Sequence, residues 1–251
     1  MCDALGRVRH MRVGVYIDGF NLYYGAKAWC GAGTPGWRWL DMRALVASKL
    51  PTLWPNASIK RLVYCTARVS GVEDPTSPQD QDRYLRALDL SGTVDKIEYG
   101  KFIARVRTSP LATRTGKGRP RITTSNWPIM VKDAARADVP DARFVASHLH
   151  REEKGSDVNV ATHLLIDVFE QTVDGAIIVS NDSDLALPIK VARSKVPVGL
   201  INPGKQQTAA DLGCDPSYGV GTHWFARFDE AAYRSHQLPD PVAMVPRPSG
   251  W

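Results

Sequence analysis

The sequence predicts an α/β fold, a three-layer α/β/α sandwich around a central and mainly parallel sheet. Short apolar runs alternate with helical patterns along most of the chain, and this alternation is typical of a parallel sheet with helices on both faces. The chain has 251 residues, of which 43% are hydrophobic, so it can fill an ordinary core. We see no internal repeat.

The N-terminal part is expected to begin with a strand and two helices. The apolar run Val13–Ile17 indicates a buried strand, and Leu22–Trp29 follows as a helix. Asp41 is a suitable N-cap for a helix over Met42–Leu50, which Pro51 ends.

The next elements are a strand, a helix and an extended segment. Ile59–Thr66 is predicted to be the second strand. A helix from Ser77 to about Leu90 follows, with Pro78 in its first turn, where proline is tolerated. Val94–Ile103 is interpreted as a third strand pair or an extended segment.

Residues 104–142 have a different composition, because basic residues are dense there and are separated by Gly, Thr and Pro. We interpret them as a basic insertion, an inserted or extended loop region with a hairpin around Ile122–Met130, followed by a short strand at Phe144–His148. Such a stretch would track a nucleic-acid backbone, and Trp127 would stack on a base. The alternative is a solvated loop with a structural tryptophan. The candidate substrate contacts in it are Arg114, Lys117, Arg119, Arg121 and Trp127.

The second half returns to regular alternation. Its predicted elements are a helix at Val158–Gln171, a strand at Ala176–Ser180, a helix at Leu185–Ser194 and a strand at Val196–Ile201. A Gly-rich segment and Trp224–Phe228 follow. We expect one domain over residues 11–228 and a loose, Pro-rich tail over residues 229–251.

Four aspartates are expected to meet at one edge of the sheet. Asp18 ends the first strand, and Asp182 and Asp184 follow the strand at 176–180. If these strands are neighbours, their ends lie about 5 Å apart. The helix that begins near Asp157 precedes that strand and must run antiparallel to it, so it also begins at this edge. Ligands bind at the carboxyl edge of such sheets.

Carboxylates gathered in this way repel one another. At about 4 Å two of them cost roughly 1 kcal/mol in water and roughly 4 kcal/mol at the effective dielectric of a cleft. The simplest reason for collecting them is a divalent cation, Mg²⁺ or Mn²⁺, which prefers oxygen ligands. We therefore expect a metal-dependent nuclease, in which a metal-bound water attacks a phosphodiester.

Each acid also has a structural interpretation. Asp157 and Asp182 could cap helices, and Asp18 could be a turn residue before a glycine. Asn21 could be an ordinary polar residue at a helix start, and Lys154 a surface lysine. It is the arrival of several such residues at one edge that favours a site.

Three segments resemble motifs of the NYN domain family, relatives of the PIN-domain nucleases that include the LabA-like and DUF88 proteins. They are Tyr16-Ile-Asp-Gly-Phe-Asn21, Lys154-Gly-Ser-Asp-Val-Asn-Val160 and Ser180-Asn-Asp-Ser-Asp-Leu185. Their order and spacing agree with the family over roughly residues 11–202. The resemblance implies a PIN-like fold and RNA cleavage that depends on magnesium or manganese.

The same resemblance implies roles for individual residues. Asp18, Asp157 and Asp182 would bind the metal, and Asp184 would complete the cluster. It also implies that two polar residues, Asn21 and Ser180, would orient an acid, a water or a phosphate oxygen. We add Lys154 as a candidate phosphate contact. The expected enzyme is a metal-dependent endoribonuclease.

Composition and charge bear on the partner and the compartment. The net charge of +6 favours a polyanion, and we expect single-stranded RNA, with a homodimer left open. The four cysteines lie far apart without metal-ligand spacing, which fits a reducing, cytoplasmic location. Residues 1–10 lack the apolar core of a signal peptide, and no run approaches the roughly 18 apolar residues of a membrane span.

Two other functions are considered. One is a catalytically inactive RNA-binding or assembly module of the same fold, although such a module gains little from carboxylates that repel one another. The other is a phosphatase of small phosphoesters. Asp18 is followed by glycine and lacks a second aspartate two residues on, so it does not fit the aspartyl-phosphate enzymes.

Overall fold

The computed structural model describes residues 10–51, 54, 56–69, 76–116, 118–126 and 129–251. The chain forms two compact units. Met1–Phe102 and Glu153–Trp251 make up the first unit, and Ile103–Glu152 make up the second.

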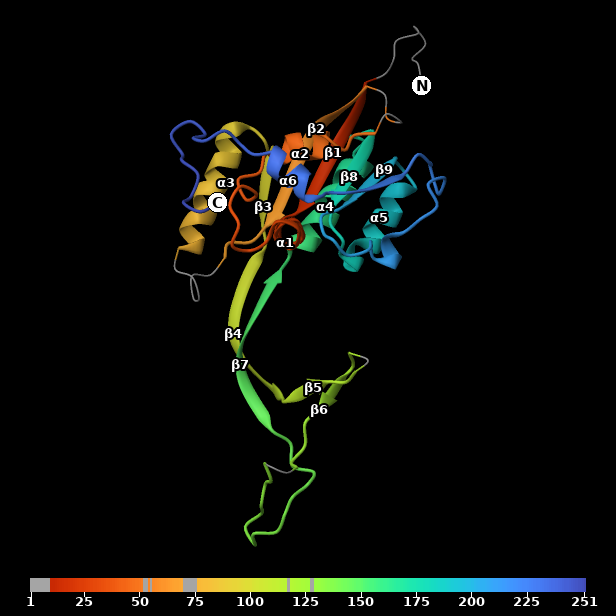
Figure 1. Ribbon diagram of the computed structural model, residues 1–251. Coiled ribbons are helices and arrows are strands. Elements are labelled where there is room, and N and C mark those ends of the chain that lie inside the picture. Colours follow the sequence, from red (N-terminus) through yellow and green to blue (C-terminus); the bar gives the residue numbers. More distant parts are fainter. Residues whose placement is uncertain (1–9, 52–53, 55, 70–75, 117, 127–128) are drawn as a thin grey trace. The chain divides into compact units, whose positions relative to one another are not determined.

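A six-stranded sheet is the centre of the first unit, with the strand order β10-β9-β8-β1-β2-β3 (Figure 1). Every pair of neighbouring strands is parallel. The prediction of an α/β fold with a mainly parallel sheet is therefore confirmed. The strands are β1 (Met11–Asp18), β2 (Ala57–Thr66), β3 (Lys96–Tyr99), β8 (Gly175–Val179), β9 (Val198–Asn202) and β10 (Trp224–Arg227).

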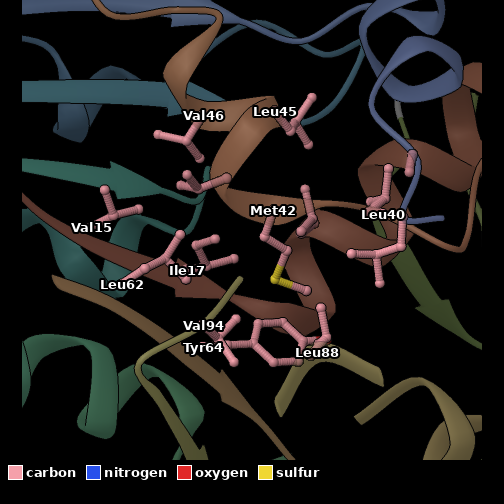
Figure 2. Close-up of a cluster of buried hydrophobic side chains, with 14 of the residues drawn as sticks. Val15, Ile17, Leu40, Met42, Leu45, Val46, Leu62, Tyr64, Leu88 and Val94 are labelled. Atoms are coloured by element: carbon pink, nitrogen blue, oxygen red, sulfur yellow. The ribbon is translucent and has the colours of Figure 1, made fainter. Parts of the chain in front are cut away.

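Two separate clusters of apolar side chains cover the two faces of this sheet. Successive residues of a strand point to opposite faces, so Val15 and Ile17 join one cluster and Tyr16 joins the other. Figure 2 shows part of the first cluster, in which Val46 and Met42 face the β1 side chains Val15 and Ile17. The arrangement is consistent with three layers.

The helices divide between the two faces according to their apolar residues. Four helices contribute to the cluster of Val15, namely α1 (Gly19–Cys30), α2 (Met42–Ala47), α3 (Ser77–Ser91) and α6 (Glu230–Ser235). Two contribute to the cluster of Tyr16, namely α4 (Ser156–Phe169) and α5 (Ala186–Arg193). The short 3₁₀ turns are η1 (Ser183–Leu185) and η2 (Ala210–Leu212).

Local sequence explains where several helices begin and end. The Asp41 side chain accepts a hydrogen bond of 2.9 Å from the amide of Ala44, as the predicted cap requires. Pro78 lies in the first turn of α3. That helix ends at Gly92, whose φ of 65° is favourable for glycine.

The expectation of a loose tail from residue 229 is wrong. Residues 230–235 form α6, and Tyr233 is fully buried with its hydroxyl donating to the carbonyl of Pro203 over 2.7 Å. Leu238, Val242 and Val245 are also buried in the first cluster. These apolar residues are too irregularly spaced to form a periodic pattern, so the prolines between them suggested a loose chain.

The second unit contains more strand than we expected. β4 (Lys101–Pro110) pairs with β7 (Val145–Lys154), and β5 (Ala112–Arg114) pairs with β6 (Pro120–Ile122) (Figure 1). One hairpin thus lies at 112–122, and Asn126 and Ile129 form an antiparallel bridge within the predicted hairpin. The prediction of a loop from residue 104 is wrong, because β4 continues to Pro110. The turn between β5 and β6 contains Gly118, whose φ of 75° is accessible to glycine without steric cost.

Candidate functional site

Asp18 and Ser180 meet where two neighbouring strands end. β1 and β8 are parallel, with Ile17 opposite Val179. The hydroxyl of Ser180 donates to Oδ2 of Asp18 over 3.0 Å. The other carboxylate oxygen accepts from the amide of Asn21 over 3.0 Å. The expected meeting of these motifs at the carboxyl edge is therefore present in the structure.

A pocket of about 440 Å³ lies at this edge, which we call the acid pocket. Four carboxylates line it: those of Asp18, Glu153, Asp157 and Asp182. Asn21 lines it too, and the aromatic rings of Phe20 and Tyr24 form part of its wall. The pocket thus combines negative charge with an apolar surface.

Three of the residues predicted for this edge do not line this pocket. Ser180 is fully buried and is connected to the pocket through Asp18. Asp184 lines a neighbouring pocket, although its charge still acts on Asp157. Lys154 is the last residue of β7, is exposed, and does not appear in the lining of the acid pocket.

Glu153 is a member of the site that the sequence did not indicate. Its Oε1 accepts from the amide of Ser156 over 3.0 Å and from the Ser156 hydroxyl over 2.7 Å, so it satisfies the N-terminus of α4. Gly100 makes this placement feasible, because a Cβ there would lie 2.5 Å from the same oxygen. Nothing in the local sequence connects Gly100 with Glu153.

Burial and mutual repulsion raise the pKa of two acids in the pocket. The pKa of Asp157 rises to about 7, first because of burial and then because of the charges of Asp18 and Asp182. Burial raises the pKa of Asp18 to about 6, against the hydrogen bonds from Asn21 and Ser180. Strongly shifted acids in a cleft favour a functional site.

The capping interpretation is right for Asp182 and wrong for Asp157. Asp182 caps η1 by accepting from the amide of Asp184 over 3.0 Å, and Asp18, whose structural interpretation is a turn residue, caps α1. Asp157 is the second residue of α4, and the cap position belongs to Gly155, whose φ is 100°. Its carboxylate therefore has no capping role there.

Asn21 connects two of the motifs. Its Oδ1 accepts from the amide of Asn181 over 3.0 Å, which ties the segment after β8 to the start of α1. Asn181 in turn accepts from the amide of Ala209 over 2.9 Å. Asn181 also lines the acid pocket, although the sequence did not single it out.

The carboxylates are the only evidence for a metal. Within the described part of the chain, no group of three or more His, Cys, Asp or Glu side chains is placed so that it could hold a metal ion. The acids share one pocket, so a cation would have to draw them closer together. Magnesium or manganese therefore stays a prediction.

The basic candidates belong to the second unit. Arg114 lies in β5 and Arg121 in β6, with Arg119 just before β6, and all three are exposed. Lys117 and Trp127 lie outside the described residues. No helix in the described part of the chain is long and apolar enough to cross a membrane.

Comparison with known proteins gives one informative relative. No family model matches the chain. The 6-hydroxy-3-succinoylpyridine 3-monooxygenase HspA of Pseudomonas putida is 27% identical over 217 residues, which cover 78% of this chain and 61% of that protein. The chain is similar to a monooxygenase. It spans about three fifths of the length of that relative.

A solved structure from Vibrio parahaemolyticus, described as a protein of unknown function, is 15% identical with a TM-score of 0.47. The match covers 92% of this chain and 99% of that one.

The prediction of a metal-dependent endoribonuclease is wrong on this comparison. The curated relative is named for a monooxygenase, which is an oxidoreductase, whereas a nuclease is a hydrolase. Carboxylates at a sheet edge suit more than one chemistry, so they did not determine the reaction. The resemblance to the NYN family and the RNA partner stay predictions, since no finding tests them.

Proposed function

We propose that this protein is an oxidoreductase that hydroxylates a small organic molecule, with the acid pocket as its reaction centre. The observation that carries the proposal is the similarity to a monooxygenase over 78% of the chain. The shifted acids mark the pocket at the carboxyl edge as the place where chemistry is favoured.

The pocket suits a ring-shaped substrate that gains and loses protons. Phe20 and Tyr24 offer aromatic surface for a flat ring. Asp157, with a pKa of about 7, exchanges protons near neutral pH, as a general acid or base requires. Asp18 accepts hydrogen bonds from Ser180 and Asn21, and so holds the ends of β1 and β8 and the start of α1 together.

The overall reaction is that of a monooxygenase. One atom of dioxygen is incorporated into the substrate, and the other leaves as water. The balance requires two protons and two electrons, and the electrons come from a diffusible donor of the reduced nicotinamide or reduced flavin class. Asp157 is placed to move a proton in the pocket.

A bound flavin dinucleotide does not fit this edge. A pyrophosphate binds where helix N-termini present free amides. Here the Asp18 carboxylate accepts from the Asn21 amide at the start of α1, and Glu153 accepts from the Ser156 amide at the start of α4. Both positions are already taken by carboxylates, which would also repel phosphate.

A divalent cation fits the donor chemistry of the pocket better. All the donors are oxygens, which Mg²⁺ and Mn²⁺ prefer, and Asp18 and Asp182 would hold the ion, which leaves Asp157 to move the proton. Bound there, it would neutralise charge and polarise an oxygen of the ligand. Mn²⁺ titration followed by electron paramagnetic resonance tests this proposal independently of activity, because the signal of free Mn²⁺ should fall with wild type and not with Asp182→Asn.

Oxygen incorporation tests the proposed reaction directly. The purified protein would be mixed with 6-hydroxy-3-succinoylpyridine, a reduced nicotinamide and ¹⁸O₂, with and without added Mn²⁺ and flavin. We expect substrate-dependent oxygen uptake and one labelled atom in the product. Asp157→Asn should lower the rate at least tenfold, as expected for the loss of a proton-transferring group.

Asp89→Asn is the matched control, because Asp89 is an exposed aspartate of α3 outside the acid pocket. It should retain the wild-type rate. Oxygen uptake that is the same with and without aromatic substrate, or label found only in water and peroxide, would contradict the proposal.

A further inference from the structure

Arg193 is a buried cation to which the described part of the chain offers no ion pair and no hydrogen-bond acceptor at Nε or Nη2. It is the last residue of α5 and only 3% of its surface is exposed. Its Nε and Nη2 atoms are buried and have no hydrogen-bond partner among the described residues. Arg193 also forms no ion pair with the described residues. The ring of Phe225 lies 5.4 Å from the guanidinium carbon. An uncompensated buried charge is strongly unfavourable, so this guanidinium requires an anionic hydrogen-bond acceptor.

The two unpaired atoms form one recognition edge. The Nε–H and one Nη2–H of a guanidinium point the same way and match the two oxygens of a carboxylate. A single water could satisfy the hydrogen bonds but would not neutralise the charge. The missing partner is therefore best described as a planar anion with two oxygens.

Arg193 lines a pocket of about 690 Å³, separate from the acid pocket. This volume is suitable for a small organic molecule. Leu187 and Lys190 of α5 line it, and Cys214 and Tyr218 of the following loop close its other side. We call it the Arg193 pocket. Lys190 adds a second positive charge to it.

The fold holds the loop against the end of α5. The amide of Val220 donates to the carbonyl of Arg193 over 3.2 Å. Gly219, with a φ of 59°, approaches so closely that a Cβ there would lie 2.3 Å from the same carbonyl oxygen. The loop is thus packed on the backbone of Arg193, whose side chain is itself buried.

The acids of the Arg193 pocket do not neutralise Arg193. Asp215 accepts from the amide and the hydroxyl of Ser217 over 2.8 and 2.7 Å, which keeps it at its own turn. Asp184 and Asp211 are exposed members of the lining. The pocket thus has a positive end at α5 and negative groups elsewhere, which suits a ligand with an anion at one end only.

We propose that the Arg193 pocket binds an organic carboxylate, whose two oxygens pair with Nε and Nη2 of Arg193. Both nitrogens are shielded from water in this structure, so the guanidinium must turn toward the pocket when the ligand enters. Nε and Nη2 give up no hydrogen bond to the described chain in that rotation, and the contact with the ring of Phe225 is lost.

If the protein is the proposed oxidoreductase, its substrate is an organic carboxylate that Arg193 anchors. This part of the inference rests on the proposed function. Asp182 of the acid pocket and Asp184 of the Arg193 pocket are two residues apart in one short segment. α5 runs from that segment to Arg193 over about 12 Å, and arginine side chains on helices lean toward the N-terminus. An extended aromatic acid anchored at Arg193 would therefore reach toward the acid pocket.

Binding of succinate tests the site without any assay of activity. Succinate carries the required group, and succinamide of similar shape lacks the charge. At constant ionic strength, we expect succinate and not succinamide to raise the melting temperature of wild type. Arg193→Met should weaken succinate binding at least tenfold in calorimetry. Arg83→Met, which changes an exposed arginine of α3, should leave it unchanged.

Arg193→Lys keeps the charge but loses the two-atom edge, so it should also bind succinate more weakly than wild type. It provides the test if Arg193→Met does not fold. Equal stabilisation by succinate and succinamide, no stabilisation by either, or wild-type affinity in Arg193→Lys would each overturn the proposal. So would binding of inorganic phosphate alone.

The same experiment separates this proposal from the proposed function. Arg193-dependent succinate binding in a protein that never consumes oxygen would support the site and remove the oxidoreductase reading. Oxygen uptake with an aromatic acid and an unchanged KM in Arg193→Lys would keep the oxidoreductase and overturn the Arg193 site.

Discussion

The hydroxyl of Ser180 lies 3.0 Å from Oδ2 of Asp18 and joins the ends of β8 and β1. The same hydroxyl oxygen accepts from the amide of Asp182 over 3.1 Å. One fully buried serine therefore positions two acids of the pocket at once.

Ser180→Ala should destabilise the protein by about 1–3 kcal/mol, because it leaves a buried carboxylate oxygen and a backbone amide without partners. The free energy of unfolding in urea measures this effect. Ser183→Ala, at an exposed position of η1, is the control and should stay within about 0.5 kcal/mol of wild type. Equal stability of the two variants would show that Ser180 does not hold the edge.

The acid pocket should make stability depend on pH. An aspartate in an unfolded chain titrates near a pKa of about 3.9, whereas the pKa of Asp157 in the folded protein is about 7 and that of Asp18 about 6. Between these values the folded protein binds more protons than the unfolded chain. Its stability therefore falls as the pH rises from about 4 to 7.

Asp157→Asn removes the ionisation with little change of shape. In EDTA, its melting temperature should exceed that of wild type by a few degrees at pH 8, and the difference should shrink toward pH 4.5. Asp89→Asn should show no such trend. A difference that does not change with pH would mean that the carboxylates of the pocket do not repel one another appreciably.

Gly100 should be a sensitive position although it lies outside the pocket. A Cβ there would meet Oε1 of Glu153 at 2.5 Å and the backbone oxygen of Lys154 at 2.7 Å. Because the second atom belongs to the backbone, β7 would have to shift. Gly100→Ala should therefore cost about 1–3 kcal/mol.

Gly116→Ala is the matched control, since no heavy atom lies within 4 Å of a Cβ at that position. Chemical denaturation of both variants gives the comparison. If Gly100→Ala is as stable as Gly116→Ala, the close approach of Gly100 to Glu153 does not constrain the fold.

Much of the fold could be predicted because its signals are local. The run Val13–Ile17 is apolar on both faces, which indicates a strand covered on both sides, and Asp41 precedes a helical pattern that ends before Pro51. The strand-helix order then placed Asp18 and Asp182 at one edge. Parallel crossover connections leave few other arrangements.

The remaining parts depend on contacts that no local pattern contains. Glu153 reaches the pocket only because Gly100 lets β7 approach, and the two are 53 positions apart in the sequence. Arg193 becomes unusual only in the folded chain, where its side chain is buried and Nε and Nη2 have no hydrogen-bond partner among the described residues. The reaction was predicted wrongly for a related reason, since an acid cluster defines a charge and not a substrate.

The second unit carries the whole net charge of the chain. Residues 103–152 contain ten of the 32 Lys and Arg but four of the 26 Asp and Glu, so this unit has a formal charge of +6 and the rest of the chain has none. Such a concentration of charge favours a polyanion. Replacing the exposed Arg114, Arg119 and Arg121 together by glutamine should therefore weaken binding of a single-stranded oligouridylate.

Salt dependence shows whether these arginines contact phosphates. The slope of log affinity against log salt should flatten by about 0.7 for each lost contact with a single strand, so by at most roughly 2 for the triple variant. The control replaces three exposed basic residues of the first unit, Lys60, Arg83 and Arg86, and should keep the wild-type slope. Circular dichroism of each variant establishes that the unit stays folded. If the slope and the affinity are the same in both triple variants, these three arginines are merely solvated, and the excess charge of this unit serves something other than RNA binding through β5 and β6.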